Sequence, residues 1–188
     1  MSKFIGAQAD VGIAKEGTRG TAESTASFWV PKVSLTMDDV IEQAMDESSV
    51  GVIEDMTDAK IVKKASEGEI EAKVGDKSIG LILLGSLGSV STSGPTDSAY
   101  THTFSVLQSA QHPSLTVFVD DENQDYKYAL GMITSFELSA EVGKFVTYKA
   151  GIRAKAGATA TLSPSYTAEN SFLAQHAVFK TATTQAGL

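Results

Sequence analysis

Apolar and polar residues alternate over residues 134–154, on both sides of Gly143. Apolar side chains recur at every second position, first from Phe136 and again from Val146. This period of two is typical of β-strands that bury one face and expose the other. The pattern therefore predicts a long antiparallel hairpin over residues 126–156.

Core residues must face core residues across this hairpin, and that requirement fixes its register. A two-residue loop would place Phe136 opposite Lys149, whereas a three-residue loop at 142–144 places Phe136 opposite Ala150. The same register sets Glu137 opposite Lys149 on the polar face, which is a favourable cross-strand pair.

The rest of the chain is predicted to be mainly β with one helix. Alternating segments indicate strands at 28–35, 59–75, 100–107 and 114–121, with a loop at 88–99. Gly68 interrupts the alternation and is interpreted as a bulge. These elements favour a β-sandwich or a partly closed barrel, with one flanking α-helix.

The helix is predicted at 76–87, because apolar residues fill most positions around its axis. Asp76 is placed to cap its start, and Gly88 is placed to end it in a left-handed conformation. A helix that is apolar on nearly all sides must be buried, so we expect it to pack on the sheet. Gly80 and Gly85 are interpreted as positions of close packing.

The domain organisation predicted from the sequence is an arm followed by one domain. Residues 1–26 are rich in small and polar residues and are expected to be a flexible arm. Residues 27–188 are expected to form a single β-sandwich domain, in which 36–58 is a long acidic loop. Such a long loop in a compact domain points to function or assembly.

The loop at 36–58 has no Lys or Arg. It is interpreted either as a solvated acidic loop or as a contact surface for a basic patch on another copy of the chain. Its acidic residues, the candidate inter-subunit or inter-ring residues, are Asp38, Asp39, Glu42, Asp46, Glu47, Glu54, Asp55 and Asp58.

Composition excludes several classes of function. The chain of 188 residues has a net charge of −8, whereas a nucleic-acid binder needs clustered Lys and Arg. It has no cysteine, and hence no disulfide or thiolate metal site. Its first residues lack the apolar run of a signal peptide, and no apolar run is long enough to span a bilayer.

The sequence offers no catalytic, metal or cofactor site. His102, His112 and His176 lack the spacing of metal ligands, and His102 is interpreted as a structural strand residue. The acidic run that starts at Asp120 lacks the glycine and the final glutamate of a calcium loop, so we interpret it as a solvated turn. The chain is therefore predicted not to be an enzyme and to need no cofactor.

Several segments in order carry a resemblance to a known family: GTRGTAES, FWVPKVSL, EGEIEAKVGDKSIGLILLGSLG, YTHTFSV, PSLTVFV and GMITSFELSAEVGKFVTYKAGIRAKAG. Over about residues 17–175 the sequence resembles the major tail tube proteins of long-tailed bacteriophages. The resemblance implies a β-sandwich whose strands join a ring-closed inner barrel, in stacked hexameric rings through which DNA is ejected. It implies no catalytic residue.

On that resemblance, we expect the polar side of the predicted hairpin to line the lumen of the tube; the alternative is that it meets outside solvent. The candidate lumen-facing residues are Ser135, Glu137, Ser139, Glu141, Thr147, Lys149 and Arg153. DNA would pass without specific binding, because attraction by counterion release needs unpaired cations.

The resemblance also implies partners and a location. The chain would bind itself, the tape-measure protein and the terminator or baseplate proteins, in a virion tail assembled in the host bacterial cytoplasm. Two alternatives remain open from the sequence: the inner tube of a contractile or type VI-like injection machine, and a capsid-decorating or other binding β-sandwich.

Overall fold

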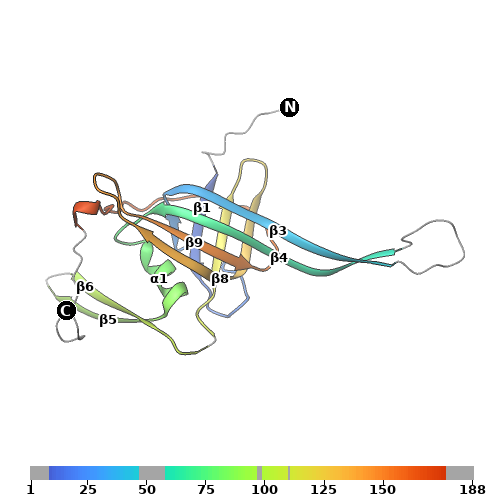
Figure 1. Ribbon diagram of the computed structural model, residues 1–188, viewed down its shortest axis with the longest axis horizontal. Coiled ribbons are helices and arrows are strands. Elements are labelled where there is room, and N and C mark those ends of the chain that lie inside the picture. Colours follow the sequence, from blue (N-terminus) through green and yellow to red (C-terminus); the bar gives the residue numbers. More distant parts are fainter. Residues whose placement is uncertain (1–8, 47–57, 97–98, 110, 177–188) are drawn as a thin grey trace, which may run out of the picture.

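The computed structural model describes residues 9–46, 58–96, 99–109 and 111–176 (Figure 1). Within these ranges the chain is mainly β, as predicted. The strands are β1 Asp10–Lys15, β2 Phe28–Val30, β3 Lys32–Asp46, β4 Asp58–Lys73, β5 Gly88–Thr96, β6 Ala99–Val106, β7 Leu115–Asp120, β8 Asp125–Ser139, β9 Thr147–Ala154 and β10 Ala158–Ala160. The helices are α1 Ile79–Leu87 and a single 3-10 turn, η2 Ala174–His176.

One antiparallel sheet runs in the order β2-β1-β7-β8-β9-β4-β3, and β10 pairs with the start of β8. β8 belongs to both halves of this sheet. Its first part pairs with β7 as far as Gly131, and its second part pairs with β9 from Met132 onward. The chain turns between the two parts, where Leu130 has a φ of 57° and the register shifts after Ile133.

The two halves of the sheet fold over each other and enclose one core, so the predicted sandwich is confirmed. β1 and β7 contribute Val11, Ile13 and Val117, which face Ile70 and Tyr148 from β4 and β9. Burying each large apolar side chain contributes roughly 1.5–3 kcal/mol. The strand path stays open in the described residues, with β2 at one end and β3 at the other, so the sandwich does not close into a barrel within one chain.

The predicted helix at 76–87 is confirmed as α1, but it begins three residues later. The expected cap, Asp76, instead accepts hydrogen bonds from the backbone and side-chain nitrogens of Asn170, at 3.1 and 3.0 Å. These bonds hold the pKa of Asp76 below its usual value. The N-cap residue is Ser78, and Gly88 ends the helix in the left-handed conformation as predicted, with φ 95°.

The hairpin at 126–156 is confirmed as β8 and β9, and so is its register. Phe136 pairs with Ala150, and Glu137 pairs with Lys149. The predicted three-residue loop at 142–144 is wrong, because β8 ends at Ser139 and β9 begins at Thr147. Residues 140–146 connect the strands, and they contain a turn in which the Lys144 amide donates to the Glu141 carbonyl oxygen at 3.0 Å.

The expectation of a flexible arm at 1–26 is wrong for its described part. β1 lies inside the sheet between β2 and β7, and Val11 and Ile13 are fully buried. Both faces of β1 are covered, so its sequence lacks the alternation of a half-exposed strand. At Gly12 an added Cβ would lie only 2.6 Å from the Cβ of Ala26, which explains why this residue is small.

The expectation of a loop at 36–58 is also wrong where the structure describes it. Residues 36–46 continue β3, and Asp58 opens β4; residues 47–57 lie outside the described residues. Met37, Ile41 and Met45 lie on one side of β3, but Asp39 and Gln43 stand between them on that side, so the alternation of a strand is masked.

Two smaller expectations are wrong as well. The segment predicted as a loop at 88–99 forms β5 and the start of β6, a separate two-stranded ribbon. Gly68 is not a bulge, because it pairs in register with Met37. A Cβ at this glycine would lie 2.1 Å from the Thr36 carbonyl oxygen, so close strand packing explains the residue.

Candidate functional site

The second part of β8, together with β9, β4 and β3, forms a four-stranded half-sheet whose outer face is polar. Cross-strand pairing aligns the residues of this face in rows. One row runs Glu137, Lys149, Glu71 and Ser34; the next runs Ser135, Gly151, Glu69 and Thr36; a third contains Arg153, Glu67 and Asp38. We call this surface the polar face.

The structure brings together six of the seven predicted lumen residues. Ser135, Glu137 and Ser139 on β8 share the polar face with Thr147, Lys149 and Arg153 on β9. All are exposed except Thr147, which is half-buried. Glu141 lies just beyond them in the turn.

Sequence reasoning missed the contribution of β4 and β3 to this face. The alternation of Glu69 and Glu71 with buried Ile70 and Ala72 was visible in the sequence. The position of β4 beside β9 was not visible in the sequence, because this contact joins segments that are far apart in the chain.

Ion pairs neutralise two cations of the polar face, Lys149 and Arg153. Lys149 Nζ lies 2.8 Å from Glu69 Oε1, and Arg153 Nε lies 3.2 Å from Glu67 Oε1. The hydrogen bond to Glu69 raises the pKa of Lys149. Beyond the ladder, Lys144 bonds Glu141 at 2.5 Å and lowers the pKa of that carboxyl. The face therefore offers carboxylates and hydroxyls, and Lys149 and Arg153 are held in ion pairs, whereas Lys73, which lies opposite Thr147, sits over the ring of Phe145 at 4.5 Å.

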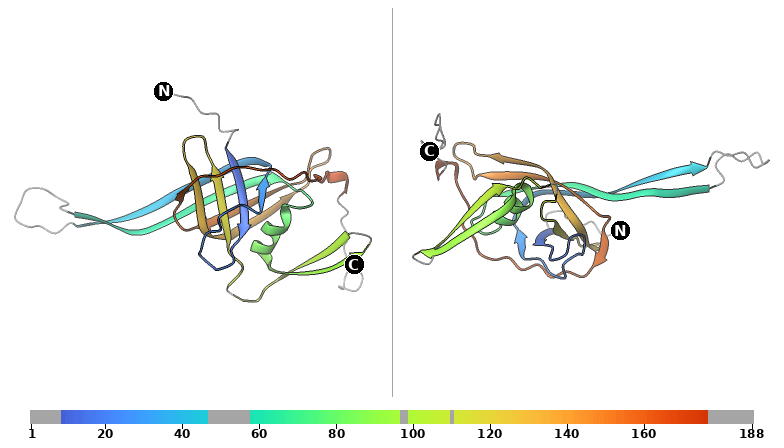
Figure 2. Two further views of the ribbon diagram at one scale, coloured as in Figure 1. Left: turned by 180° about the vertical axis from the view of Figure 1, so that it is seen from behind. Right: turned by 90° about the horizontal axis from the view of Figure 1, so that it is seen from below.

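β3 and β4 continue beyond the rest of the sheet as a two-stranded ribbon. β4 pairs with β9 only from Ser66 onward, whereas its pairing with β3 extends back to Asp58. Figures 1 and 2 show this ribbon projecting from the body along the long axis. We call residues 40–46 with 58–65 the arm; it is distinct from the N-terminal arm that was predicted at residues 1–26.

The described members of the predicted acidic contact loop lie on and around this arm, and they do not share one face. Asp38 and Glu42 share the polar face, whereas Asp39 lies on the opposite face of β3. The Asp39 carboxylate accepts hydrogen bonds from the Ser66 hydroxyl and, at 3.0 Å, from the Gly157 amide. Asp46 ends β3, and Glu47, Glu54 and Asp55 lie outside the described residues.

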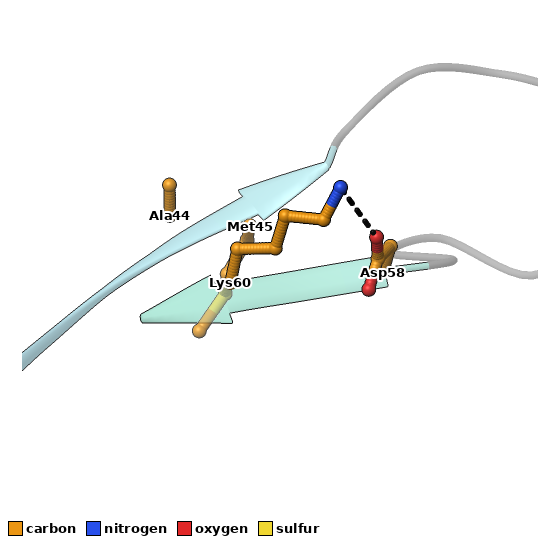
Figure 3. Close-up of a pocket in the computed structure, with 4 residues that line it drawn as sticks. All are labelled: Ala44, Met45, Asp58 and Lys60. Carbon is orange, nitrogen blue, oxygen red and sulfur yellow. Dashed lines mark ion pairs between the residues drawn. The ribbon is translucent and has the colours of Figure 1, made fainter. Parts of the chain in front are cut away.

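Two lysines of the arm already form ion pairs with acidic residues of the same chain. Lys63 Nζ lies 2.5 Å from Glu42 Oε1, and Lys60 Nζ lies 3.5 Å from Asp58 Oδ2 (Figure 3). The shallow pocket at the arm's end is lined by Ala44, Met45, Asp58 and Lys60.

The three histidines lie in separate places with structural partners. His102 contacts the Thr92 hydroxyl at 2.9 Å on the β5–β6 ribbon, and His112 Nε2 lies 3.1 Å from the Leu107 carbonyl oxygen. Within the described residues, no group of three or more acidic, histidine or cysteine side chains is placed to hold a metal ion. No described helix is long and apolar enough to cross a membrane.

Comparisons with known proteins point to one family. The family model described as "Phage tail tube protein" matches residues 6–188. A search of curated proteins finds no match. Among solved structures, the chain is similar to one in the virion of a native gene transfer agent particle, with 11% identity, 70% of this chain and 85% of that chain covered, and a TM-score of 0.43. It is also similar to a chain in the tail of an empty gene transfer agent particle with C6 symmetry. This match has 12% identity, covers 81% of this chain and 96% of that chain, and has a TM-score of 0.43.

Proposed function

The chain belongs to the phage tail tube protein family, and on this premise we propose that its copies join into hexameric rings that stack into a tube for DNA. The observation that supports this proposal is the four-stranded half-sheet, which has one buried face, one polar face and two open edges. A structural component of a virion tail needs a repeating contact, and these edges offer one.

The open edges lie at β3 and at the second part of β8. In the described residues, β3 pairs only with β4, and β8 pairs only with β9 after Gly131. The four strands alternate in direction, so β3 and β8 run in opposite directions. Copies related by rotation would therefore bring β8 of one beside β3 of the next in antiparallel order. Such pairing removes both edges from solvent and closes a barrel.

Closure of this kind puts the polar face on the inside of the ring. The buried face of the half-sheet is occupied by the core of its own subunit, so only the polar face is free to line a channel. Its carboxylates and hydroxyls, with Lys149 and Arg153 held in ion pairs, would let a polyanion slide without being retained. The competing arrangement would have this face meet outside solvent.

The remaining contacts of the tube belong to the same proposal. The arm, with Asp38 and Glu42 near its root, would reach a neighbouring copy. The two ends of the tube would meet tape-measure, terminator or baseplate proteins, and assembly would take place in the host bacterial cytoplasm.

Added positive charge on the polar face tests the lumen assignment. Glu137→Lys with Ser139→Lys places cations on exposed positions of β8 whose side chains form no ion pair within the described residues. Electron microscopy should still show tubes, whereas particles carrying the variant should release their genome several-fold more slowly. The matched control is Glu137→Gln with Ser139→Gln, which should eject at the wild-type rate. Equal ejection by both variants would place this face outside the channel.

A further inference from the structure

A buried carboxylate that the proposed function does not use lies where the two halves of the sheet meet. Glu16 directly follows β1 and is only 5% exposed. Within the described residues, no cation forms an ion pair with it. Burying a carboxylate without a cation is costly unless hydrogen bonds replace its hydration. The hydrogen bonds of Glu16 therefore show what this side chain holds.

Four donors converge on the two carboxylate oxygens of Glu16. The Leu130 amide donates to Oε1 at 2.7 Å, and the Thr116 hydroxyl donates to the same oxygen at 3.3 Å. The Gly20 amide and the Ser114 hydroxyl donate to Oε2 at 2.6 and 2.5 Å. One carboxylate thus connects the loop after β1, the start of β7 and the middle of β8.

The middle of β8 is bulged beside Glu16, because three steps along β8, from Tyr128 to Gly131, face only two steps along β7. The extra residue of a bulge loses its place in the ladder, and the strand bends there. Leu130 lies in this bulge with a φ of 57°, a left-handed conformation that residues with a side chain rarely adopt. An amide without an acceptor would destabilise the bulge. The carboxylate of Glu16 supplies that acceptor.

The loop after β1, which contains the segment GTRGTAES, holds this carboxylate in place. The Gly17 amide donates to Glu23 Oε1 at 2.7 Å, and the Glu23 amide donates to the Thr116 hydroxyl oxygen at 3.0 Å. Gly20 has a φ of 78°, and its carbonyl oxygen accepts a hydrogen bond from the Lys155 ammonium at 2.9 Å. Lys155 directly follows β9, so the loop ties β7, in one half of the sheet, to the end of β9, in the other half.

The bulge at Leu130 separates the part of β8 that pairs with β7 from the part that pairs with β9, so we call it the joint. We propose that Glu16 is the positioning residue of this joint, whose carboxylate fixes the bend and sets the angle at which each copy carries its four-stranded half-sheet into the ring. The step from the joint to the ring rests on the proposed function. A ring of identical copies closes only when every copy presents its contacts at the same angle, so a loose joint would oppose closure.

Distances between two spin labels measure the angle at the joint in the isolated subunit, because the native chain has no cysteine. Thr159→Cys places one label on β10, which pairs with the first part of β8, and Glu137→Cys places the other on the second part. Both positions are exposed. The labelled chain with Glu16 should give one narrow distance distribution.

Glu16→Met keeps the length of the side chain and removes both acceptors. It should broaden the distance distribution, and the Leu130 amide should exchange with solvent roughly tenfold faster or more. The matched control is Glu169→Met, since the Glu169 carboxylate also accepts an amide and a hydroxyl, both from Ser78 and both at 3.0 Å, but at the start of α1. This control should keep the narrow distribution. An unchanged distribution for Glu16→Met would overturn the proposal.

Glu16→Gln takes the place of Glu16→Met if the latter does not fold. A side-chain amide has one oxygen, so either the Leu130 or the Gly20 amide loses its acceptor and should exchange roughly tenfold faster. The distribution should broaden if the Leu130 amide is the one affected. Exchange at the wild-type rate at both amides would overturn the role of the carboxylate, and fast exchange at Leu130 with a narrow distribution would overturn its control of the angle.

Ring formation tests the last step separately. Folded Glu16→Met or Glu16→Gln subunits with a loosened joint should need a roughly tenfold higher concentration to form rings, whereas Glu169→Met should assemble like wild type. Rings at the wild-type concentration from a loosened joint would show that the joint does not govern assembly, and the tube function would stand. If wild type forms no rings, the tube function fails and takes this last step with it, while the label distances still decide whether Glu16 holds the joint.

Discussion

Lys149 forms its ion pair with Glu69 of β4, at 2.8 Å, and not with Glu137, the residue directly opposite it on β8. Both carboxylates lie on the polar face, on the two neighbours of β9. The register predicted from the hairpin is therefore right, but the ionic partner comes from the other side. The position of one charged residue in a sheet thus depends on both neighbouring strands.

This geometry predicts unequal effects of two matched substitutions. Glu69→Gln should lower the free energy of unfolding by roughly 0.2–1 kcal/mol, the usual range for an exposed pair, and the loss should shrink at high salt. Glu137→Gln should have a smaller effect. Denaturant unfolding of both variants at low and high ionic strength measures the difference; a larger loss for Glu137→Gln would contradict the observed pairing.

The same contrast shows what sequence alone could predict. Contacts between neighbours in the chain were accessible, because alternation on both sides of Gly143 fixes how Phe136 meets Ala150. The pairing of β9 with β4 was not accessible, since it joins segments far apart and no local pattern encodes it. The polar face was thus predicted from two of its four strands.

The missed elements share a physical cause, which is that their burial differs from the usual one-sided strand. β1 is covered on both sides, so Val11 and Ile13 show no alternation with polar residues. β3 extends into the arm, where acidic residues hide the apolar positions of Ile41 and Met45. β5 is built largely from Ser, Thr and Gly, so its composition resembles that of a loop.

Leu138 tests the closure of the ring. It lies opposite the buried Tyr148, on the core side of β8, but it stays 59% exposed at the open edge. Leu138→Asp should change the stability of the isolated subunit by about 0.5 kcal/mol or less. It should prevent ring formation, because a neighbouring copy would have to bury the carboxylate.

Ser139→Asp is the matched control, since it introduces the same charge at the next residue on the polar face. Thermal unfolding measures the stability of the isolated subunit, and electron microscopy with light scattering measures whether rings form. Rings of normal size from Leu138→Asp would show that this edge of β8 is not an intersubunit contact.

Two glycines of α1 predict opposite responses to alanine. At Gly80 the nearest atom to an added Cβ is 3.8 Å away, on Phe104, so Gly80→Ala should stabilise the protein by about 0.4–1 kcal/mol. At Gly85 an added Cβ would lie 3.0 Å from Ile133 and 3.1 Å from Leu115. Gly85→Ala should therefore be roughly 1–3 kcal/mol less stable than Gly80→Ala. The denaturant midpoints of the two variants measure this difference in stability. Equal midpoints would mean that α1 is free to move away from the sheet.

A carboxylate cluster at one end of β1, β7 and β8 predicts a dependence of stability on pH. Burial first, and then the charges of Asp125, Asp10 and Asp121, raise the pKa of Asp120 above its usual value of 3.8. Asp10 is the cross-strand partner of Asp120, and its carboxylate also accepts a hydrogen bond from the Tyr166 hydroxyl. Folding therefore favours the protonated form of Asp120.

Because the pKa of Asp120 is higher in the folded state, its contribution to stability is complete below pH 3.8 and is lost as the pH rises through the folded value. Asp120→Asn removes this loss, so the variant should have a higher Tm than wild type at pH 7. The difference should disappear below pH 3.8, where the carboxyl is protonated in both states. Glu122→Gln, an exposed residue of the following turn, changes the net charge equally and should shift Tm much less. A higher Tm for Asp120→Asn that persists unchanged at low pH would assign the gain to packing instead of to charge repulsion within the cluster.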